Sequence, residues 1–195
     1  MVLIINNDTK GFSKNFFEEA KHKFSQDENL AFLGPKILDY DGNVLSDGTP
    51  KEKFGIIMDV PTEGYFIRVS VIQKIALFNE KLVRYFEDLD LIIRLRNEGY
   101  LVRSSSDIYF YHLCNGTSSK QAWVPNYYRA RNVHWFIRHY CDDKSFYWRL
   151  RKSLNSIPFS LRRIQIFIRR RQYLKVPVVL SAYLCGTFVG IFTKW

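Results

Sequence analysis

The sequence has few cysteines, and none of them are paired by spacing. Cys114, Cys141 and Cys185 are scattered over 195 residues. This pattern excludes a disulfide framework and a cysteine-based zinc site, and it favours a reducing compartment. Hydrophobic residues make up 47% of the chain and aromatic residues 16%, which excludes a disordered protein. The length suits one domain, or one domain with an appendage.

Acidic residues are absent from the last quarter of the sequence. From Lys144 onward there are 11 lysines and arginines and no acid, whereas the other 143 residues hold 18 basic and 19 acidic groups. We therefore predict a near-neutral α/β body over residues 1–140 and a basic amphipathic helical tail over residues 141–195. A polyanionic surface, either a membrane or a nucleic acid, is the expected neighbour of the tail.

The tail has the features of a helix that lies on a membrane. At about 100° per residue, four apolar and four basic residues fall on opposite faces of one predicted helix: Ile157, Leu161, Ile164 and Ile168 against Arg162, Arg163, Arg169 and Arg170. Residues 176–193 are uncharged but contain Pro177 and two glycines, which favours an interfacial or packed helix over a transmembrane one. Aromatic residues among the arginines leave nucleic acid as the less favoured partner.

The body is predicted to alternate strands and helices. Val2 to Ile5 is apolar at every position, which predicts a strand buried on both faces in the middle of a parallel sheet. Apolar spacing, capping and turn residues predict three helices in the body, over Ser13–Phe24, from Ser70 through Leu77, and from the Phe86–Asp90 cluster to near Gly99. The remaining strands are expected at Ala31–Leu38, Tyr65–Val69, Tyr100–Arg103 and Ile108–Leu113.

Asp8 follows the first predicted strand. In open α/β sheets, ligands bind at the carboxyl ends of the strands, where a carboxylate can hold a divalent cation. The alternative is that Asn7 or Asp8 only caps the following turn, and Asp8 taken alone favours that interpretation.

Glu87, Asp88 and Asp90 form the most acidic local cluster. A helix N-terminus favours one or two carboxylates through capping and the helix dipole. Three within four residues, directly after Tyr85 and Phe86, also suit a site in which one carboxylate is a general base.

His112 is placed at the end of a predicted strand, ahead of the polar loop Asn115–Ser119. A histidine beside carboxylates suits a transition ion such as manganese. A purely structural histidine is the alternative.

Taken in order, these segments resemble the family 2 glycosyltransferases, especially the rhamnosyltransferase-like branch that builds bacterial surface polysaccharides. The resemblance covers roughly residues 1–135. It rests on Leu3–Thr9, Leu33–Leu38 with Asp41-Gly42, Leu77–Glu80, Phe86–Leu91 with Arg94, Gly99-Tyr100, His112 with Ser118 downstream, and Tyr127–Asn132.

The resemblance implies part of a GT-A fold, with a mixed sheet, and an inverting transfer of sugar from a nucleotide-sugar to a saccharide or lipid-linked acceptor. It makes Asp88 the base, Glu87 and Asp90 the residues that position the acceptor, and Asp8 and His112 the ligands of Mn²⁺ or Mg²⁺. The expected location is cytoplasmic and peripheral, at an anionic surface on the inner face of the cell membrane.

The sequence departs from the family pattern at its start. The family's catalytic domain begins with nucleotide-binding βα units ahead of the strand that carries the metal-binding acid, and this sequence begins at that strand. We therefore expect the C-terminal portion of such an enzyme. The alternatives are an inactive fragment, one half of an enzyme whose partner chain binds the nucleotide, and a basic membrane-binding module.

Overall fold

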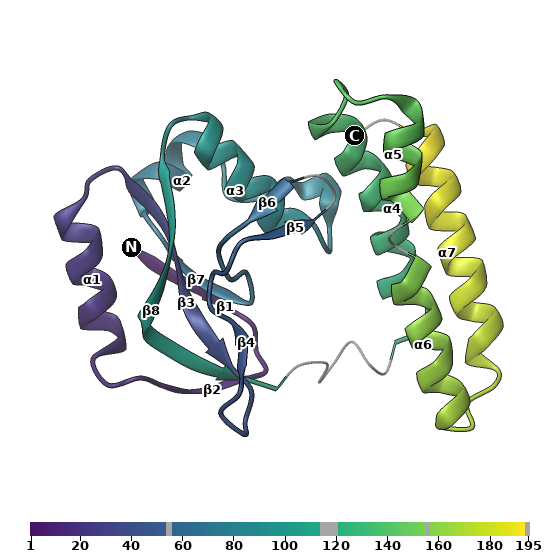
Figure 1. Cartoon of the computed structure of the whole chain (residues 1–195), viewed down its shortest axis with the longest axis horizontal. Coiled ribbons are helices and arrows are strands. Elements are labelled where there is room, and N and C mark those ends of the chain that lie inside the picture. The colour runs from purple at the N-terminus through teal and green to yellow at the C-terminus, as the bar shows by residue number, and fades with distance from the viewer. Residues whose placement is uncertain (54–55, 114–120, 155–156, 194–195) are drawn as a thin grey trace. The chain divides into compact units, whose positions relative to one another are not determined.

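The computed structural model describes residues 1–53, 56–113, 121–154 and 157–193 (Figure 1). The chain divides into two compact units. The sheet unit comprises Met1–Lys53, Ile57–Asn79 and Asp88–Gly116, and the helical unit comprises Phe54–Ile56, Glu80–Glu87 and Thr117–Trp195.

The sheet unit is built on a mixed sheet, as predicted. Its strand order is β1-β7-β3-β8-β2, with β4 also paired to β3. The β3–β8 pair is parallel, and the other pairs are antiparallel. The strands are β1 (Val2–Ile5), β2 (Thr9–Phe12), β3 (Leu30–Leu38), β4 (Val44–Ser46), β7 (Gly64–Ile67) and β8 (Leu101–His112). Beside the sheet are the short pair β5 (Lys51–Lys53) and β6 (Ile56–Met58), and the helices α1 (Phe16–Gln26), α2 (Val69–Ile75) and α3 (Glu87–Asn97).

The prediction for the first strand was wrong. β1 lies at one end of the strand order and pairs antiparallel with β7, instead of lying in the middle of a parallel sheet. Leu3 and Ile5 pack against the core, whereas Val2 is exposed. An apolar run specifies that a strand is partly buried, but it does not specify how many neighbours the strand has.

The two strands predicted at Tyr100–Arg103 and Ile108–Leu113 are one continuous strand, β8. The polar residues between them do not end it. The register of β8 against β3 shifts between Pro35 and Lys36, and β8 pairs with β3 on both sides of this shift. A β-bulge of this kind accommodates extra residues without ending a strand.

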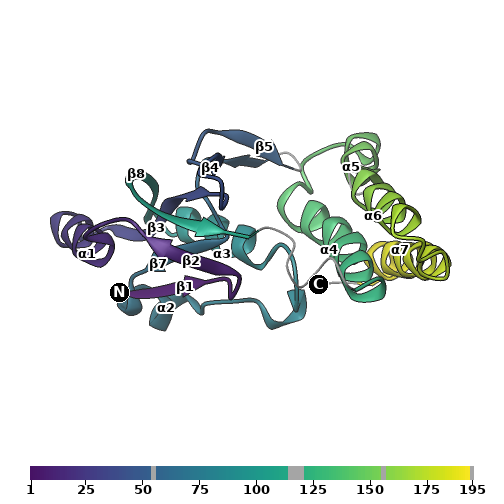
Figure 2. The same cartoon turned by 90° about the horizontal axis from the view of Figure 1, so that it is seen from below.

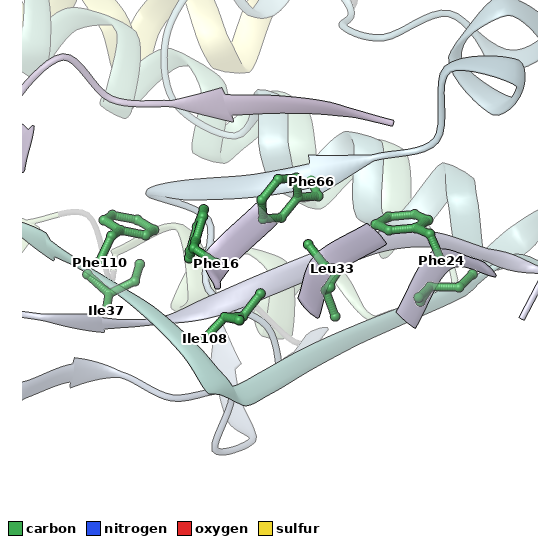
Figure 3. Close-up of a cluster of buried hydrophobic side chains, with 9 residues drawn as sticks. Phe16, Phe24, Leu33, Ile37, Phe66, Ile108 and Phe110 are labelled. Carbon is green, nitrogen blue, oxygen red and sulfur yellow. The ribbon is translucent and has the colours of Figure 1, made fainter. Parts of the chain in front are cut away.

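The core of the sheet unit lies between α1 and one face of the sheet (Figure 3). Phe16, Ala20 and Phe24 are spaced at one helical turn along α1, and all three are buried. They meet Leu33, Ile37, Phe66, Ile108 and Phe110 from three strands. Because successive strand residues point to opposite faces, Phe32 and Tyr65 lie on the other face, where their rings stack at 4.3 Å.

The helical unit contains α4 (Trp123–Tyr140), α5 (Phe146–Ser153), α6 (Ile157–Arg169) and α7 (Lys175–Phe192), with the single turn η1 (Glu80–Leu82). α7 packs against α4 and α6, and the three run side by side (Figures 1 and 2). The contact with α4 is close: a Cβ on Gly186 would lie 2.3 Å from the carbonyl oxygen of Tyr127. Tyr127–Asn132, one of the segments on which the family resemblance rests, lies in α4 and so packs within the helical unit, N-terminal to the boundary predicted at residue 140.

On α7 a row of large apolar side chains is exposed, whereas on α6 only Leu161 and Ile168 are exposed and the other large apolar side chains are buried or half-buried. On α6 the buried residues are Ser160, Arg163 and Phe167, whereas Leu161 on the predicted apolar face is 52% exposed. On α7, Leu184 and Phe188 are 65% and 63% exposed. Within the described part of the chain, α7 is the one helix whose length and mean hydropathy of 1.6 would allow it to cross a membrane.

Candidate functional site

The structure brings Asp8 and His112 into contact, although 104 positions separate them in the sequence. Thr9 at the start of β2 pairs with His112 at the end of β8, and this register places Asp8 beside the imidazole. His112 Nε2 lies 2.9 Å from Asp8 Oδ1. The Asn6 amide nitrogen lies 3.5 Å from the same ring nitrogen, and the Leu113 backbone N–H donates to the Asp8 carbonyl oxygen. Both side chains are mostly buried.

The Asp8–His112 pair fits two ligands of one divalent cation. Ligand atoms at about 2.1 Å from an octahedral ion, in neighbouring positions, are about 3 Å apart. The observed 2.9 Å between Asp8 Oδ1 and His112 Nε2 meets that requirement. Among the described residues no group of three or more His, Cys, Asp or Glu side chains could hold a metal ion, and the predicted metal site stays a prediction.

Asp88 is oriented by a tyrosine from the sheet. The Tyr65 hydroxyl in β7 donates to Asp88 Oδ1 at 2.8 Å. Tyr65 is itself buried and stacked on Phe32, so the position of its hydroxyl is well defined. Sequence reasoning did not identify Tyr65 as a site residue. An aromatic residue in a strand gives no indication of the carboxylate that it will meet.

Asp90 has a structural role in this fold. Its side chain is buried and pairs with Arg94 one helical turn later, at 2.8 Å. Arg94 also donates to the carbonyl oxygens of Ile75, Ala76 and Leu77, which follow α2. Through Arg94, Asp90 therefore connects α3 to the end of α2. Its predicted contact with an acceptor stays a prediction, and the burial of its side chain does not favour such a contact.

Glu87, the first residue of α3, has an unusual environment. Its Oε2 atom is buried and has no hydrogen-bond partner among the residues that the structure describes. Burial raises the pKa of the Glu87 carboxyl above its ordinary value, against a smaller opposing effect of the Arg84 charge. The predicted contact of Glu87 with an acceptor stays a prediction.

The strand directions place Asp8, His112 and Tyr65 at one end of the sheet. β1 ends at Ile5, which pairs with Gly64 at the start of the antiparallel strand β7. β8 runs opposite to β7, because it is parallel to β3, and it therefore ends at the same edge. Cys114, the loop Asn115–Ser119 and Ser118 within it lie outside the described residues.

No family model, no curated protein and no solved structure matches this chain. The α/β class, the mixed sheet and the C-terminal helices are confirmed, whereas the GT-A fold stays a prediction.

Proposed function

We propose that the sheet unit forms the acceptor side of an inverting, metal-dependent glycosyltransferase. The observations that support this proposal are two separate contacts of the sheet unit, the Asp8–His112 pair and the Tyr65–Asp88 hydrogen bond, which involve strand residues at the same end of the sheet. These groups would supply two cation ligands and one oriented carboxylate, which are the main requirements of a single displacement at a sugar carbon.

In the proposed reaction an acceptor hydroxyl attacks the anomeric carbon of a nucleotide-sugar. The new carbon–oxygen bond forms as the bond to the nucleoside diphosphate breaks, and Asp88 takes the hydroxyl proton. Tyr65 keeps Asp88 in position through the hydrogen bond from its hydroxyl. Mn²⁺ or Mg²⁺, when bound by Asp8 and His112, would neutralise charge on the departing diphosphate. One base and one displacement invert the configuration at that carbon.

The decisive test compares Asp88→Asn with Asp107→Asn in the full chain. Asp107 is an exposed carboxylate of the same unit and provides the matched control. We expect Asp88→Asn to abolish transfer from a panel of nucleotide-sugars in the presence of Mn²⁺, with an unchanged circular dichroism spectrum, and Asp107→Asn to retain it. Normal turnover by Asp88→Asn would contradict the proposal.

Binding of Mn²⁺, followed by electron paramagnetic resonance, separates the enzyme from the alternatives. We expect Asp8→Asn and His112→Gln to lose the bound-metal signal. A chain that binds Mn²⁺ but transfers no sugar would favour the alternative in which a partner chain supplies nucleotide binding. A chain that binds no metal and transfers no sugar would favour the membrane-binding module.

We further propose that the helical unit associates with an anionic membrane surface, at the inner face of the cell membrane. Outward apolar side chains on α6 and α7 support this, and so does the basic run Arg169–Arg171 between these helices. Anionic lipids attract each surface arginine by about 1 kcal/mol. We expect sedimentation with phosphatidylglycerol vesicles, and its loss in the Leu184→Gln, Phe188→Gln double variant. Salt-sensitive RNA binding without lipid binding would favour nucleic acid instead.

A further inference from the structure

The segment Leu82–Phe86 of the helical unit has an unusual backbone. Val83, Tyr85 and Phe86 have φ values of 53°, 66° and 75°, a region that side chains other than glycine rarely adopt. The Asn132 amide nitrogen of α4 lies 2.7, 2.8 and 2.9 Å from the carbonyl oxygens of residues 82, 84 and 85. Helix α4 therefore holds this segment in a conformation that it would not adopt alone, and the segment presents the ring of Tyr85.

Three arginines from three segments surround Tyr85. The Arg84 guanidinium lies 5.5 Å from the ring centroid, and that of Arg129, on α4, lies 5.8 Å from it. Arg163, on α6, interacts electrostatically with Tyr85. Phe159 joins the group, with the Arg129 guanidinium 4.2 Å and the Arg163 guanidinium 5.5 Å from its centroid. We call Arg129, Arg163 and Tyr85 the arginine pocket.

Within the described part of the chain, neither Arg129 nor Arg163 forms an ion pair with a carboxylate. Arg163 is only 5% exposed, and the Arg129 Nε atom is buried with no hydrogen-bond partner in the described part of the chain. Burial is the main cause that lowers the pKa of both guanidinium groups, and each also feels a neighbouring arginine.

Such an arrangement is costly without a counter-ion. A buried charge needs a partner, and two like charges together cost more than either alone. An anion that reaches between the guanidiniums would satisfy the orphaned Nε–H, and the Tyr85 hydroxyl offers a further polar contact. Guanidinium groups bind phosphate oxygens in a planar, two-point geometry. Two guanidiniums match the charge of a phosphate dianion or a diphosphate better than that of a single carboxylate.

We propose that the arginine pocket is a binding site for a phosphate or diphosphate group. This inference does not rest on the proposed sugar transfer, because every residue that carries it belongs to the helical unit. Two sources share the chemistry: a soluble diphosphate ester and the headgroup of an anionic phospholipid.

The primary test titrates the full chain with pyrophosphate at constant ionic strength and follows heat by calorimetry. We expect saturable binding to the wild type and affinity at least about tenfold weaker in Arg129→Gln and in Arg163→Gln. Arg151→Gln removes an exposed arginine of α5 and should bind like the wild type. Absence of binding to the wild type, or equal binding by Arg129→Gln, would overturn the proposal.

A second measurement distinguishes binding from a purely structural role. Without pyrophosphate, Arg129→Gln should lose little stability, because the loss of the guanidinium contacts with Tyr85 and Phe159 is offset by removal of a buried charge that has no carboxylate partner among the described residues. If the variant fails to fold, the wild type still gives an answer: pyrophosphate should protect Arg129 from phenylglyoxal, as mapped by peptide mass spectrometry. Unchanged labelling of Arg129 would overturn the proposal.

Vesicle experiments identify the source of the phosphate. Release of the chain from phosphatidylglycerol vesicles by pyrophosphate, but not by sulfate at equal ionic strength, would support the pocket and assign it to the lipid headgroup. Pyrophosphate binding measured in solution without such release would support the pocket and assign it to a soluble diphosphate.

Discussion

The two units distribute apolar and charged side chains in opposite ways. In the sheet unit Phe16, Phe66 and Phe110 are buried, and the ion pair Lys23–Asp107 is exposed. In the helical unit, large apolar side chains on α6 and α7 face outward, while Arg163 is buried. The sheet unit therefore buries these apolar side chains and exposes this ion pair, whereas the helical unit exposes large apolar side chains and buries an arginine.

The comparison teaches that the environment has to be inferred for each unit separately. Scattered exposed apolar residues are normal, but contiguous rows of them indicate an interaction surface. Leu180, Leu184 and Phe188 are spaced at one turn of α7 and form such a row. This row is the feature of α7 on which the proposed membrane contact rests.

The largest expected effect lies in the core of the sheet unit. Phe110→Ala removes a fully buried ring that meets α1 and should lower the free energy of unfolding by about 3–5 kcal/mol. Phe12→Ala, at a half-exposed ring of β2, is the matched control and should cost much less. Hydrogen exchange measured on sheet peptides reports this change.

Tryptophan fluorescence tells whether the loss stays within the sheet unit. All four tryptophans lie at position 123 or beyond, so their unfolding transition reports the helical unit. We expect that transition to stay unchanged in Phe110→Ala. If the tryptophan transition shifted as much as the sheet unit is destabilised, the two units would unfold together. The two units would then differ in packing but not in stability.

The next effect distinguishes the two faces of α7. Gly186→Leu places side-chain atoms where the Tyr127 carbonyl oxygen and Ala130 already lie, and it should cost about 3 kcal/mol. Leu184→Ala changes the exposed face of the same helix and should cost little in water. The midpoint of urea unfolding, followed by tryptophan fluorescence, measures both. A larger loss for Leu184→Ala would mean that the outward row is covered.

Much of the sheet unit could be predicted because its signals are local. The helical spacing of the apolar residues Phe16, Ala20 and Phe24 predicted α1. Gly99, at a φ of 81°, lies near the predicted end of α3. The edge position of β1 could not be predicted, because strand neighbours are set by contacts far along the sequence. The apolar face of α6 was predicted from its spacing. The burial of Arg163 on the same helix could not be predicted, because it too depends on contacts far along the sequence.

The candidate site was predictable in its residue types but not in its partnerships. Asp8 and His112 were proposed separately from their positions at strand ends, and the β2–β8 register joins them. Nothing in the sequence links Tyr65 to Asp88, whereas the spacing of four residues between Asp90 and Arg94 on a predicted helix is typical of an ion pair. The charge excess of the tail was visible, whereas the gathering of Arg129 and Arg163 about Tyr85 required the fold.

A smaller effect concerns His134, a buried residue of α4. Burial, with a contribution from the charge of Arg138, lowers the pKa of His134 to about 4. The unfolded chain, with an ordinary pKa near 6.5, binds more protons between these values, so stability should fall by about 2–3 kcal/mol as the pH falls from 7 to 4.5. Tryptophan fluorescence in urea at several pH values measures the loss.

The His134→Gln variant should lose this part of the pH dependence. His139→Gln removes an exposed histidine of the same helix and is the matched control. Equal pH dependence in His134→Gln and the wild type would show that other groups cause the loss. It would also remove one of the signs that the interior of the helical unit disfavours positive charge.

The smallest effect returns to the paired charges of the sheet unit. Lys23 and Asp107 lie 2.7 Å apart, but Asp107 is 63% exposed. Water screens such a pair, so Lys23→Ala should cost less than about 1 kcal/mol, and the cost should shrink further in high salt. Hydrogen exchange on the α1 peptide at two salt concentrations measures it. A large, salt-independent cost would mean that Lys23 contributes to stability mainly through packing of its aliphatic chain. The contrast between the solvated ion pair of the sheet unit and the buried arginines of the helical unit would then rest on Arg129 and Arg163 alone.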